Sequence, residues 1–363
     1  MMLALPSTRE EAWRWSDLSA LPALAAASPA GGAIDASGLW LGCGGPRLLF
    51  VDGRLDPAAS EAGLLALGPI GLTSAHPLGR LATGEGWMLD LGREHAPPAT
   101  IEIVHVATGG ANHLPARIAL ADDAQASIVE TFVGDGWANR LTHITLGRGA
   151  RLMRAVRLLQ ASGFTSLRDE AAIGQGASYV ATMLGAGGAG TRIDAALTLS
   201  GIGAYGEMGG ALLARGEQRH EAAVVMRHAA CGGTSRQVWR AVADDAAMAS
   251  LASRVEVARD AQKTDGEQSL RGLLLKRSAT VNLKPELEIF ADDVKCAHGA
   301  TVGELDARAL FYLESRGIPP AGARALLTRA FVADALDRIG DEPVRDAFVV
   351  DADRWLDGEG QKG

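Results

Sequence analysis

The hydrophobic pattern of the middle of the chain is that of short strands separated by glycine-containing corners. From about Ile101 onward, segments of alternating apolar and polar residues recur, as expected for strands with one buried face. Three of them begin at Ala150, Ala177 and Ala204, each directly after a glycine and 27 residues from the next. A unit of this length holds several strands of about five to six residues and leaves no room for a crossover helix. The pattern therefore predicts a repetitive, mainly β architecture.

Repetition at a fixed period is typical of a solenoid, and short strands with glycine corners indicate a β-helix. Two further strand-like pieces, Ala195–Leu199 and Ala222–Met226, also lie 27 residues apart. The chain has 45 glycines against 14 prolines and no G-X-Y period, so we interpret the glycines as tight corners and exclude collagen. A parallel β-helix is the favoured fold, and an all-β sandwich is the alternative.

The two ends of the chain have a different texture. In the first hundred residues, Thr8–Leu18 has helical spacing and Leu48–Gly53 reads as a short strand that enters a turn. After Gly303, the composition predicts two helices, Glu304–Arg316 and Gly322–Ile339. We expect a mixed N-terminal region (1–100), a β-helix core (101–302) and a small C-terminal helical domain (303–363).

The predicted C-terminal helices have recognisable ends. Gly317 and Gly340 stand where C-terminal caps belong, and Pro319-Pro320 begins the second helix. This helix carries an apolar stripe and a polar side, the latter expected to be a solvated face if the stripe packs on the body of the protein. The stripe consists of Leu326, Ala330, Phe331, Ala335, Leu336 and Ile339, and the polar side of Arg324, Arg329, Asp334, Asp337 and Arg338.

Charge and cysteine usage exclude several classes of protein. The net charge is −8 and Lys and Arg are not clustered, which argues against a nucleic-acid-binding protein. No apolar run is long enough to span a membrane, and Arg9, Glu10 and Glu11 near the start do not fit a signal peptide. Only three, widely spaced cysteines are present, which favours a cytoplasmic, reducing environment over a disulfide framework.

Most familiar catalytic motifs are missing. The segment from Gly185 to Gly190 matches G-x-G-x-x-G, but Ser200–Gly206 soon follows it, and no amphipathic helix opens at the third glycine as dinucleotide binding requires. We therefore predict a solenoid corner there. Neither a G-x-S-x-G elbow nor a phosphate-binding loop occurs. His220 and His228 could share one strand face, but a core or solvent-facing position is the more common one for histidine.

Three adjacent carboxylate pairs also have an ordinary interpretation. Neighbouring residues of a strand point to opposite faces, so such a pair cannot act as a facing acid–base dyad. We expect these residues at corners or edges of the fold. They are Asp122-Asp123, Asp244-Asp245 and Asp292-Asp293.

The remaining candidate site is Cys296 and His298. In a strand these two side chains project to the same face, and a thiolate with an imidazole suits iron or zinc. Two ligands cannot hold an ion alone, so the site would be half of a shared one. The alternative is a buried thiol beside a surface histidine.

The residues around this site resemble the SufB/SufD family of iron–sulfur cluster assembly proteins, and within it the SufD branch. The resemblance is most specific over Pro285–Gly303 and Phe311–Ile318, and it includes Ala261–Asp265 and Gln268. It extends from about Ile101 to Ile339. Two departures stand out: Trp239-Arg240 replaces an aromatic–lysine pair, and Gly266 replaces an alanine.

The resemblance implies a right-handed parallel β-helix flanked by helical pieces, which agrees with the repeat spacing. It implies a non-catalytic scaffold subunit of a SufBCD-type complex of the SUF system. Its partners would be a SufB-like subunit and a SufC-like ATPase, with a homodimer in isolation. Transient iron or a nascent iron–sulfur cluster would lie at the partner interface, with His298 and Cys296 as its ligands, and no cofactor would be tightly bound by this chain alone.

The resemblance also implies that the C-terminal helical domain binds the ATPase. The residues expected to take part here are Phe311, Tyr312, Arg316, Leu326 and Phe331. The main alternative function is a β-helix carbohydrate-active enzyme, a lyase or hydrolase working through exposed carboxylates. A chain with three tyrosines and seven tryptophans offers few aromatic sugar platforms. A further alternative is a homotrimeric β-helix acyltransferase, but the hexapeptide repeat typical of such proteins is absent from this sequence.

Overall fold

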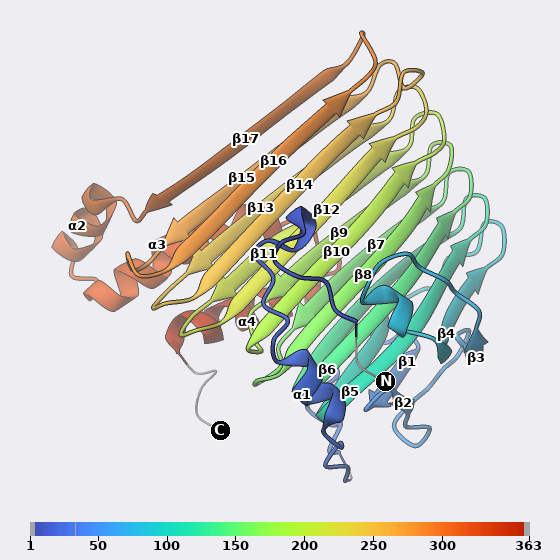
Figure 1. Ribbon diagram of the computed structural model, residues 1–363, viewed down its shortest axis with the longest axis horizontal. Helices are drawn as coiled ribbons and strands as arrows, with labels where there is room; N and C mark the ends of the chain where they lie inside the picture. The colour runs from blue at the N-terminus through green and yellow to red at the C-terminus, as the bar shows by residue number, and fades with distance from the viewer. Residues whose placement is uncertain (1–3, 33, 359–363) are drawn as a thin grey trace.

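The computed structural model describes residues 4–32 and 34–358, and the centre of the molecule is a parallel β-solenoid (Figure 1). This confirms the predicted mainly β, parallel β-helix fold. The solenoid strands are β5 (Ile101–Leu120), β6 (Gln125–Leu146), β7 (Arg151–Leu158), β8 (Phe164–Ile173), β9 (Ser178–Gly185), β10 (Gly190–Leu199), β11 (Tyr205–Ala214), β12 (Arg219–His228), β13 (Thr234–Ala243), β14 (Met248–Val257), β15 (Asp265–Leu274), β16 (Thr280–Ile289) and β17 (Lys295–Glu304).

The strands form two parallel ladders that face each other across one core. One ladder joins the first part of β6 to β7, β9, β11, β13, β15 and β17. The other joins the second part of β6 to β8, β10, β12, β14 and β16. We call the first ladder the helix-side sheet and the second the opposite sheet. Each turn of the solenoid therefore contributes one strand to each sheet.

The long strands β5 and β6 run through both sheets and turn at glycines. The register between them shifts between Thr108 and Ala111, where Gly109 and Gly110 have φ angles of 124° and 62°. A Cβ on Gly110 would lie 2.7 Å from the carbonyl oxygen of Ala27. Glycine is needed here because the backbone is left-handed and a neighbouring segment comes close.

In the helix-side sheet, the predicted spacing of 27 residues is confirmed from β7 to β9 and from β9 to β11, whereas the next rung is longer. The amide of Ser178 donates to the carbonyl of Ala150, and that of Tyr205 to Ala177, both at 2.8 Å. Ala204 continues this buried column.

In the opposite sheet, the expected spacing of 27 is wrong. Ala195 pairs with Val224 rather than with Ala222, because this turn of the solenoid is two residues longer than expected. A shift of two residues keeps the same side chains facing the core.

The corner predictions are also confirmed. Gly185 ends β9 and Gly190 begins β10, so the glycine-rich segment is a turn between strands. A Cβ on Gly187 would lie 2.4 Å from the Gln160 carbonyl oxygen, which requires the smallest residue. All three carboxylate pairs lie between strands, and Asp123 and Asp245 adopt left-handed φ angles of 59° and 56°.

The N-terminal region adds strands to the start of the solenoid. Both β1 and β4 pair in parallel with β5, and β1 confirms the strand predicted around Leu48. The helix predicted over Thr8–Leu18 is wrong, because only Glu11–Trp13 forms a 3₁₀ turn and the side chains of Trp13 and Ser16 are buried against the body. The elements are η1 (Glu11–Trp13), α1 (Leu21–Ala26), β1 (Arg47–Val51), β2 (Arg54–Leu55), β3 (Ala66–Ile70), η2 (Gly79–Leu81) and β4 (Gly84–Leu91).

Three helices follow the solenoid: α2 (Ala307–Ser315), α3 (Pro320–Leu336) and α4 (Glu342–Asp357). The first begins later than expected, because Glu304 still belongs to β17 and Asp306 caps α2 by accepting from the Arg308 amide. Pro320 begins α3 as predicted, but α3 ends at Leu336, so Gly340 is not its cap. Gly340 packs beside Met153 instead. The helix α4 was not expected.

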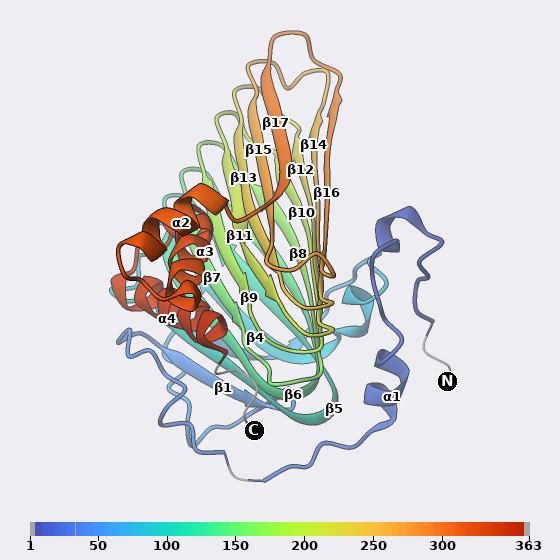
Figure 2. The ribbon, with the colours of Figure 1, turned by 90° about the vertical axis from the view of Figure 1, so that its left-hand side faces the viewer.

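The helices cover the outer surface of the helix-side sheet, and Figure 2 shows them along one side of the solenoid, with α1 on the other. Their buried side chains form a second apolar cluster with outward-facing residues of the sheet. The buried face of α3 differs from the predicted stripe, because Ala323 and Val332 are buried whereas Leu326 is 41% exposed. None of the helices in the described ranges is long and apolar enough to cross a membrane.

Candidate metal centre at the open end of the solenoid

The last two strands form an open end of the solenoid. In the described part of the chain, β17 pairs only with β15 and β16 only with β14. Figure 1 shows β17 as the outermost strand at this end. Each of these 10-residue strands therefore presents one edge of unpaired backbone N–H and C=O groups.

Cys296 and His298 lie on β17 and share its inner face, as the alternation predicted. Their ladder partners are Gly266 and Gln268, both buried between the sheets. Directly paired residues of a parallel ladder point to the same side, so both candidate ligands face the interior. Cys296 is half-buried, whereas His298 is exposed because no further turn covers it.

The thiol of Cys296 lies against the apolar core. Burial raises its pKa above the ordinary value, and the nearby Asp265 carboxylate acts in the same direction. Lys295 does not oppose this, because it precedes Cys296 in the strand and so points to the other face. The free chain therefore holds a protonated thiol at neutral pH.

The rim of this end is unusually apolar. Ile289, Phe290 and Val302 are 39%, 61% and 45% exposed, and Val281 and Leu283 on the inner face of β16 are only partly buried. Within residues 4–32 and 34–358, no group of three or more His, Cys, Asp or Glu side chains is placed to hold a metal ion. The end thus combines two candidate metal ligands, free strand edges and exposed apolar side chains.

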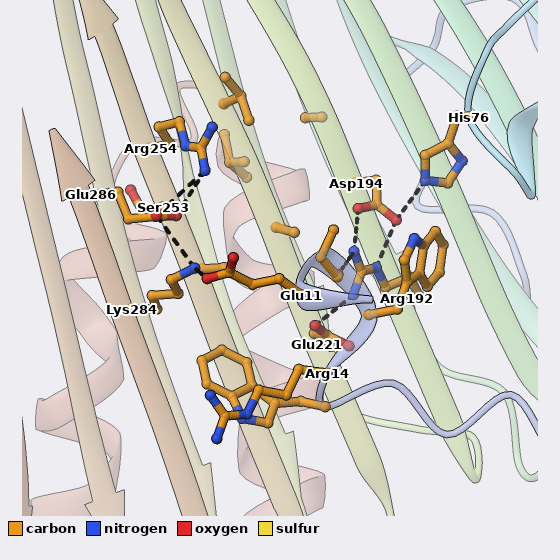
Figure 3. A pocket seen from close by; sticks show the side chains of 18 of the residues that line it. Glu11, Arg14, His76, Arg192, Asp194, Glu221, Ser253, Arg254, Lys284 and Glu286 are labelled. Atoms are coloured by element: carbon orange, nitrogen blue, oxygen red, sulfur yellow. Dashed lines mark hydrogen bonds and ion pairs between the residues drawn. The ribbon is translucent and has the colours of Figure 1, made fainter. Parts of the chain in front are cut away.

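A separate cavity of about 400 Å³ lies between the N-terminal segment and the outer face of the opposite sheet (Figure 3). Arg192 is its central group: the guanidinium contacts Asp194 and Glu221 at 2.7 and 2.5 Å and lies 4.3 Å from the Trp13 ring centroid. It also donates to the Ala12 carbonyl, while Glu221 accepts from Ser16. These contacts attach the N-terminal segment to the sheet.

The cavity bears on the carbohydrate-enzyme alternative, because it holds carboxylates near tryptophans. Arg192 and His76 lower the pKa of Asp194, whereas burial raises that of Glu221. However, both oxygens of Asp194 accept from the Arg192 guanidinium, and Glu221 contacts the same guanidinium with one oxygen and accepts from Ser16 with the other. All four oxygens of this pair are thus already engaged by Arg192 or Ser16, so the geometry disfavours acid–base catalysis here.

The structure also places the residues expected to contact a partner through the helical domain. Phe311 and Tyr312 on α2 are 73% and 56% exposed, and the Arg316 guanidinium lies 5.1 Å from the Tyr312 ring centroid. Leu326 on α3 is exposed near them in the chain, but Phe331 packs against the apolar cluster beneath the helices. Four of the five residues are therefore accessible.

Sequence reasoning missed the inner neighbours of the candidate ligands. Gln268 lies one rung below His298, and its side-chain amide donates to Ser253 Oγ at 2.8 Å and to the Glu286 carbonyl at 3.3 Å. The resemblance included Gln268 without giving it a role, and a glutamine or a serine in a strand indicates no chemistry by itself. Only the rung length places Gln268 under His298.

Comparison with known proteins gives a consistent picture. The family model described as "SUF system FeS cluster assembly, SufBD core domain" matches residues 105–331. The iron–sulfur cluster assembly protein SufD of Escherichia coli is 27% identical over 385 residues, which cover 98% of this chain and 90% of that protein.

Two further relatives agree over shorter stretches. A SufBD family protein of Synechocystis is 44% identical over 107 residues, or 30% of this chain and 24% of its own length. SufD of Bacillus subtilis is 27% identical over 245 residues, or 66% and 56%. Since the core-domain match spans more than half of the described chain, the protein belongs to the SufB/SufD family of iron–sulfur cluster assembly proteins and resembles SufD.

Proposed function

We propose that this chain is a scaffold subunit of a SufBCD-type complex and that it pairs with a SufB-like subunit through the open end of the solenoid. The observation that carries this proposal is the pair of free edges on β16 and β17. A long, unpaired strand edge is a template for pairing with another chain. The exposed Phe290 and Val302 supply apolar area for the same interface. Without its partner, a second copy of this chain would occupy the edge.

Cys296 and His298 would then face the partner and provide half of a binding site for iron or a nascent cluster. A neutral imidazole ligates iron directly, whereas the protonated thiol of Cys296 must first lose its proton. His298 is therefore the primary ligand and Cys296 the secondary one. The cluster is cargo that this subunit helps to build, with the remaining ligands supplied by the partner.

The test is substitution of each ligand in the co-expressed complex. His298→Ala should leave the subunits associated on size-exclusion chromatography but lower the iron and sulfide content per complex. Cys296→Ser should cause a smaller loss. Full cluster content in the His298→Ala complex would remove the residue from the site and leave the chain a structural partner only.

A second surface, consisting of Phe311, Tyr312, Arg316 and Leu326, is proposed to dock the SufC-like ATPase. Its support is that α2 buries none of its own residues and presents two large aromatic side chains to solvent. Aromatic and arginine residues are the usual anchors of protein interfaces.

Phe311→Glu should abolish recovery of the ATPase with the tagged chain without changing the melting temperature. The matched control is Val350→Glu on α4, where the side chain is 46% exposed but lies away from α2 in sequence. Undiminished ATPase recovery with Phe311→Glu would refute this docking surface.

A further inference from the structure

A further cavity, of about 260 Å³, lies where the end of α4 meets the corners that follow β7, β9 and β11. We call it the α4 cavity. It shares no lining residue with the open end of the solenoid or with the cavity beneath the N-terminal segment. Four of its side chains carry N–H donors, namely Arg215, Gln218, Arg354 and Trp355. The cavity is therefore rich in hydrogen-bond donors.

The charged groups of the α4 cavity leave positive charge without a partner. Among the described residues, Asp351 is the only carboxylate in the lining. Both of its oxygens are already bound by Arg157, at 2.6 and 3.1 Å. Arg354 approaches Asp351 only to 3.9 Å, which is beyond hydrogen-bond distance. Arg354 therefore lacks a strong anionic partner in the described chain.

The second guanidinium, that of Arg215, is fixed in place without contacting a carboxylate. Its Nη2 donates to the Trp355 carbonyl, and the group lies 4.2 Å from the centroid of the Trp355 ring. The carboxylates of Asp244 and Asp245 act on Arg215 only from a distance, because both pair with Lys276. Burial lowers the pKa of Arg215, which an anion bound in the cavity would oppose.

Two neutral donors of the lining also lack acceptors. Gln218 Oε1 accepts from the Arg215 backbone amide at 2.9 Å, which leaves its Nε2 without a hydrogen bond to the described chain. Trp355 is 5% exposed, and its Nε1–H is buried without a partner in the same part of the chain. A buried donor of this kind indicates a bound water or ion.

The end of α4 does not oppose a bound anion strongly. Carbonyl oxygens at a helix C-terminus carry partial negative charge. Here the Gly358 amide donates to the carbonyls of Arg354 and Trp355, and Arg215 donates to the second of them. The negative end of the helix is therefore already paired with donors.

We propose that the α4 cavity binds a phosphate group between Arg215 and Arg354, with Gln218 and Trp355 beside it. Guanidinium N–H groups match the oxygens of phosphate in pairs, and a dianion gains more from two cations than a carboxylate does. The cavity is larger than a phosphate ion, so the ligand is either free phosphate or a small phosphate ester. The inference does not depend on the function proposed above.

The test follows the Trp355 indole N–H in the full-length chain. Spectra of protein with ¹⁵N-labelled tryptophan resolve the indole signals, and Trp355→Phe identifies the relevant one. Inorganic phosphate, added at constant ionic strength, should shift this signal saturably. Arg354→Gln changes a side chain that is 66% exposed and should weaken phosphate binding by about 10- to 100-fold, the effect of losing a hydrogen bond to a charged group.

The matched control is Arg345→Gln, the same change earlier on α4 and outside the cavity lining. It should leave the phosphate affinity unchanged. A wild-type signal that phosphate does not shift saturably overturns the proposal. Equal weakening by the two substitutions overturns it too, because only general charge attraction would then be at work. The wild-type titration remains decisive even if a variant fails to fold.

Two comparison ligands test the selectivity and identify the source of the phosphate group. Glycerol 3-phosphate binding at least as tightly as inorganic phosphate would support a site for a small ester, and weaker binding would support a site for the free ion. Acetate should shift the Trp355 signal only at much higher concentration. Acetate as effective as phosphate would overturn the assignment to phosphate.

Discussion

Gly266 leaves a space beneath the candidate thiol that a methyl group would fill. A Cβ at this position would lie 3.4 Å from Cys296 Sγ and from Val255 Cγ1, and 3.5 Å from Ser235 Oγ, which are ordinary contact distances. The backbone is not left-handed there. Gly266→Ala should therefore raise the free energy of unfolding by about 0.4–1 kcal/mol, mainly by restricting the unfolded chain. Chemical denaturation measures this, and a destabilised variant would show that the thiol needs the space.

The reactivity of Cys296 should reflect its half-buried position. Its raised pKa means that little thiolate is present at neutral pH, so alkylation should be slow. The rate should still rise above about pH 9.5, where an ordinary thiol is almost fully ionised. Mass spectrometry of the iodoacetamide-treated chain measures the rate for each cysteine. Fast modification of Cys296 at pH 7 would contradict the buried-thiol geometry.

At this scale the sequence predicted part of the site. Strand alternation was sufficient to place Cys296 and His298 on one face. It could not tell whether that face was inside or outside, because the answer depends on which residues β15 places beneath them. Gln268 was beyond prediction for the same reason, since corner lengths vary and the rung partner follows only from the folded register.

Among the elements, α4 is held to the helix-side sheet by a buried ion pair. Arg157 Nε and Nη2 contact the two carboxylate oxygens of Asp351 at 2.6 and 3.1 Å, with both side chains buried. Asp351→Ala should destabilise the protein by about 3–5 kcal/mol, because it leaves Arg157 buried without its partner.

The control for this change lies two residues further along the same helix. Asp353 pairs with Arg329 at the surface, so Asp353→Ala should cost at most about 1 kcal/mol. Thermal and urea unfolding of the two variants compares them. Equal losses of stability in the two variants would show that the buried Arg157–Asp351 pair matters no more to stability than a surface ion pair.

The helix α4 could have been predicted from sequence. Asp341 accepts from the Val344 amide as N-cap, Pro343 occupies the first turn, and Gly358 ends the helix with a φ of 77°. Phe348 and Trp355 lie on the apolar face between these signals. The 3₁₀ turn near the N-terminus is the opposite case, because tertiary contacts of Trp13 override a helical pattern.

At the scale of the whole molecule, the C-terminal helices shield apolar side chains of the helix-side sheet from solvent, in addition to presenting the proposed docking surface. Deleting residues 303–363 would expose Leu184, Leu213 and Val242 of the sheet and remove the carboxylate partners of Arg157 and Arg240. The truncated chain should therefore unfold at lower urea concentration or aggregate, as sedimentation and circular dichroism would report. A truncated chain as stable as the full one would contradict this role.

The interior of the molecule also predicts sensitivity to acid. His105 and His220 are fully buried, and burial lowers the pKa of each to about 4. In the unfolded chain a histidine has a pKa near 6.5. Between about pH 6.5 and 4, these histidines are therefore protonated in the unfolded state but neutral in the folded state, and the unfolded state binds more protons. Stability should be highest above this window and should fall as the pH drops through it, by about 1.4 kcal/mol per pH unit for each such histidine.

His220 allows a clean test of this account, because neither ring nitrogen has a hydrogen-bond partner in the described chain. His220→Leu removes a buried, unpaired polar group and should raise stability at pH 7 by about 1–3 kcal/mol. It should also make the loss of stability between pH 6.5 and 4.5 less steep, since one proton-binding site of the unfolded state is gone. Urea unfolding at a series of pH values measures both effects. A slope that His220→Leu leaves unchanged would disprove the role of burial.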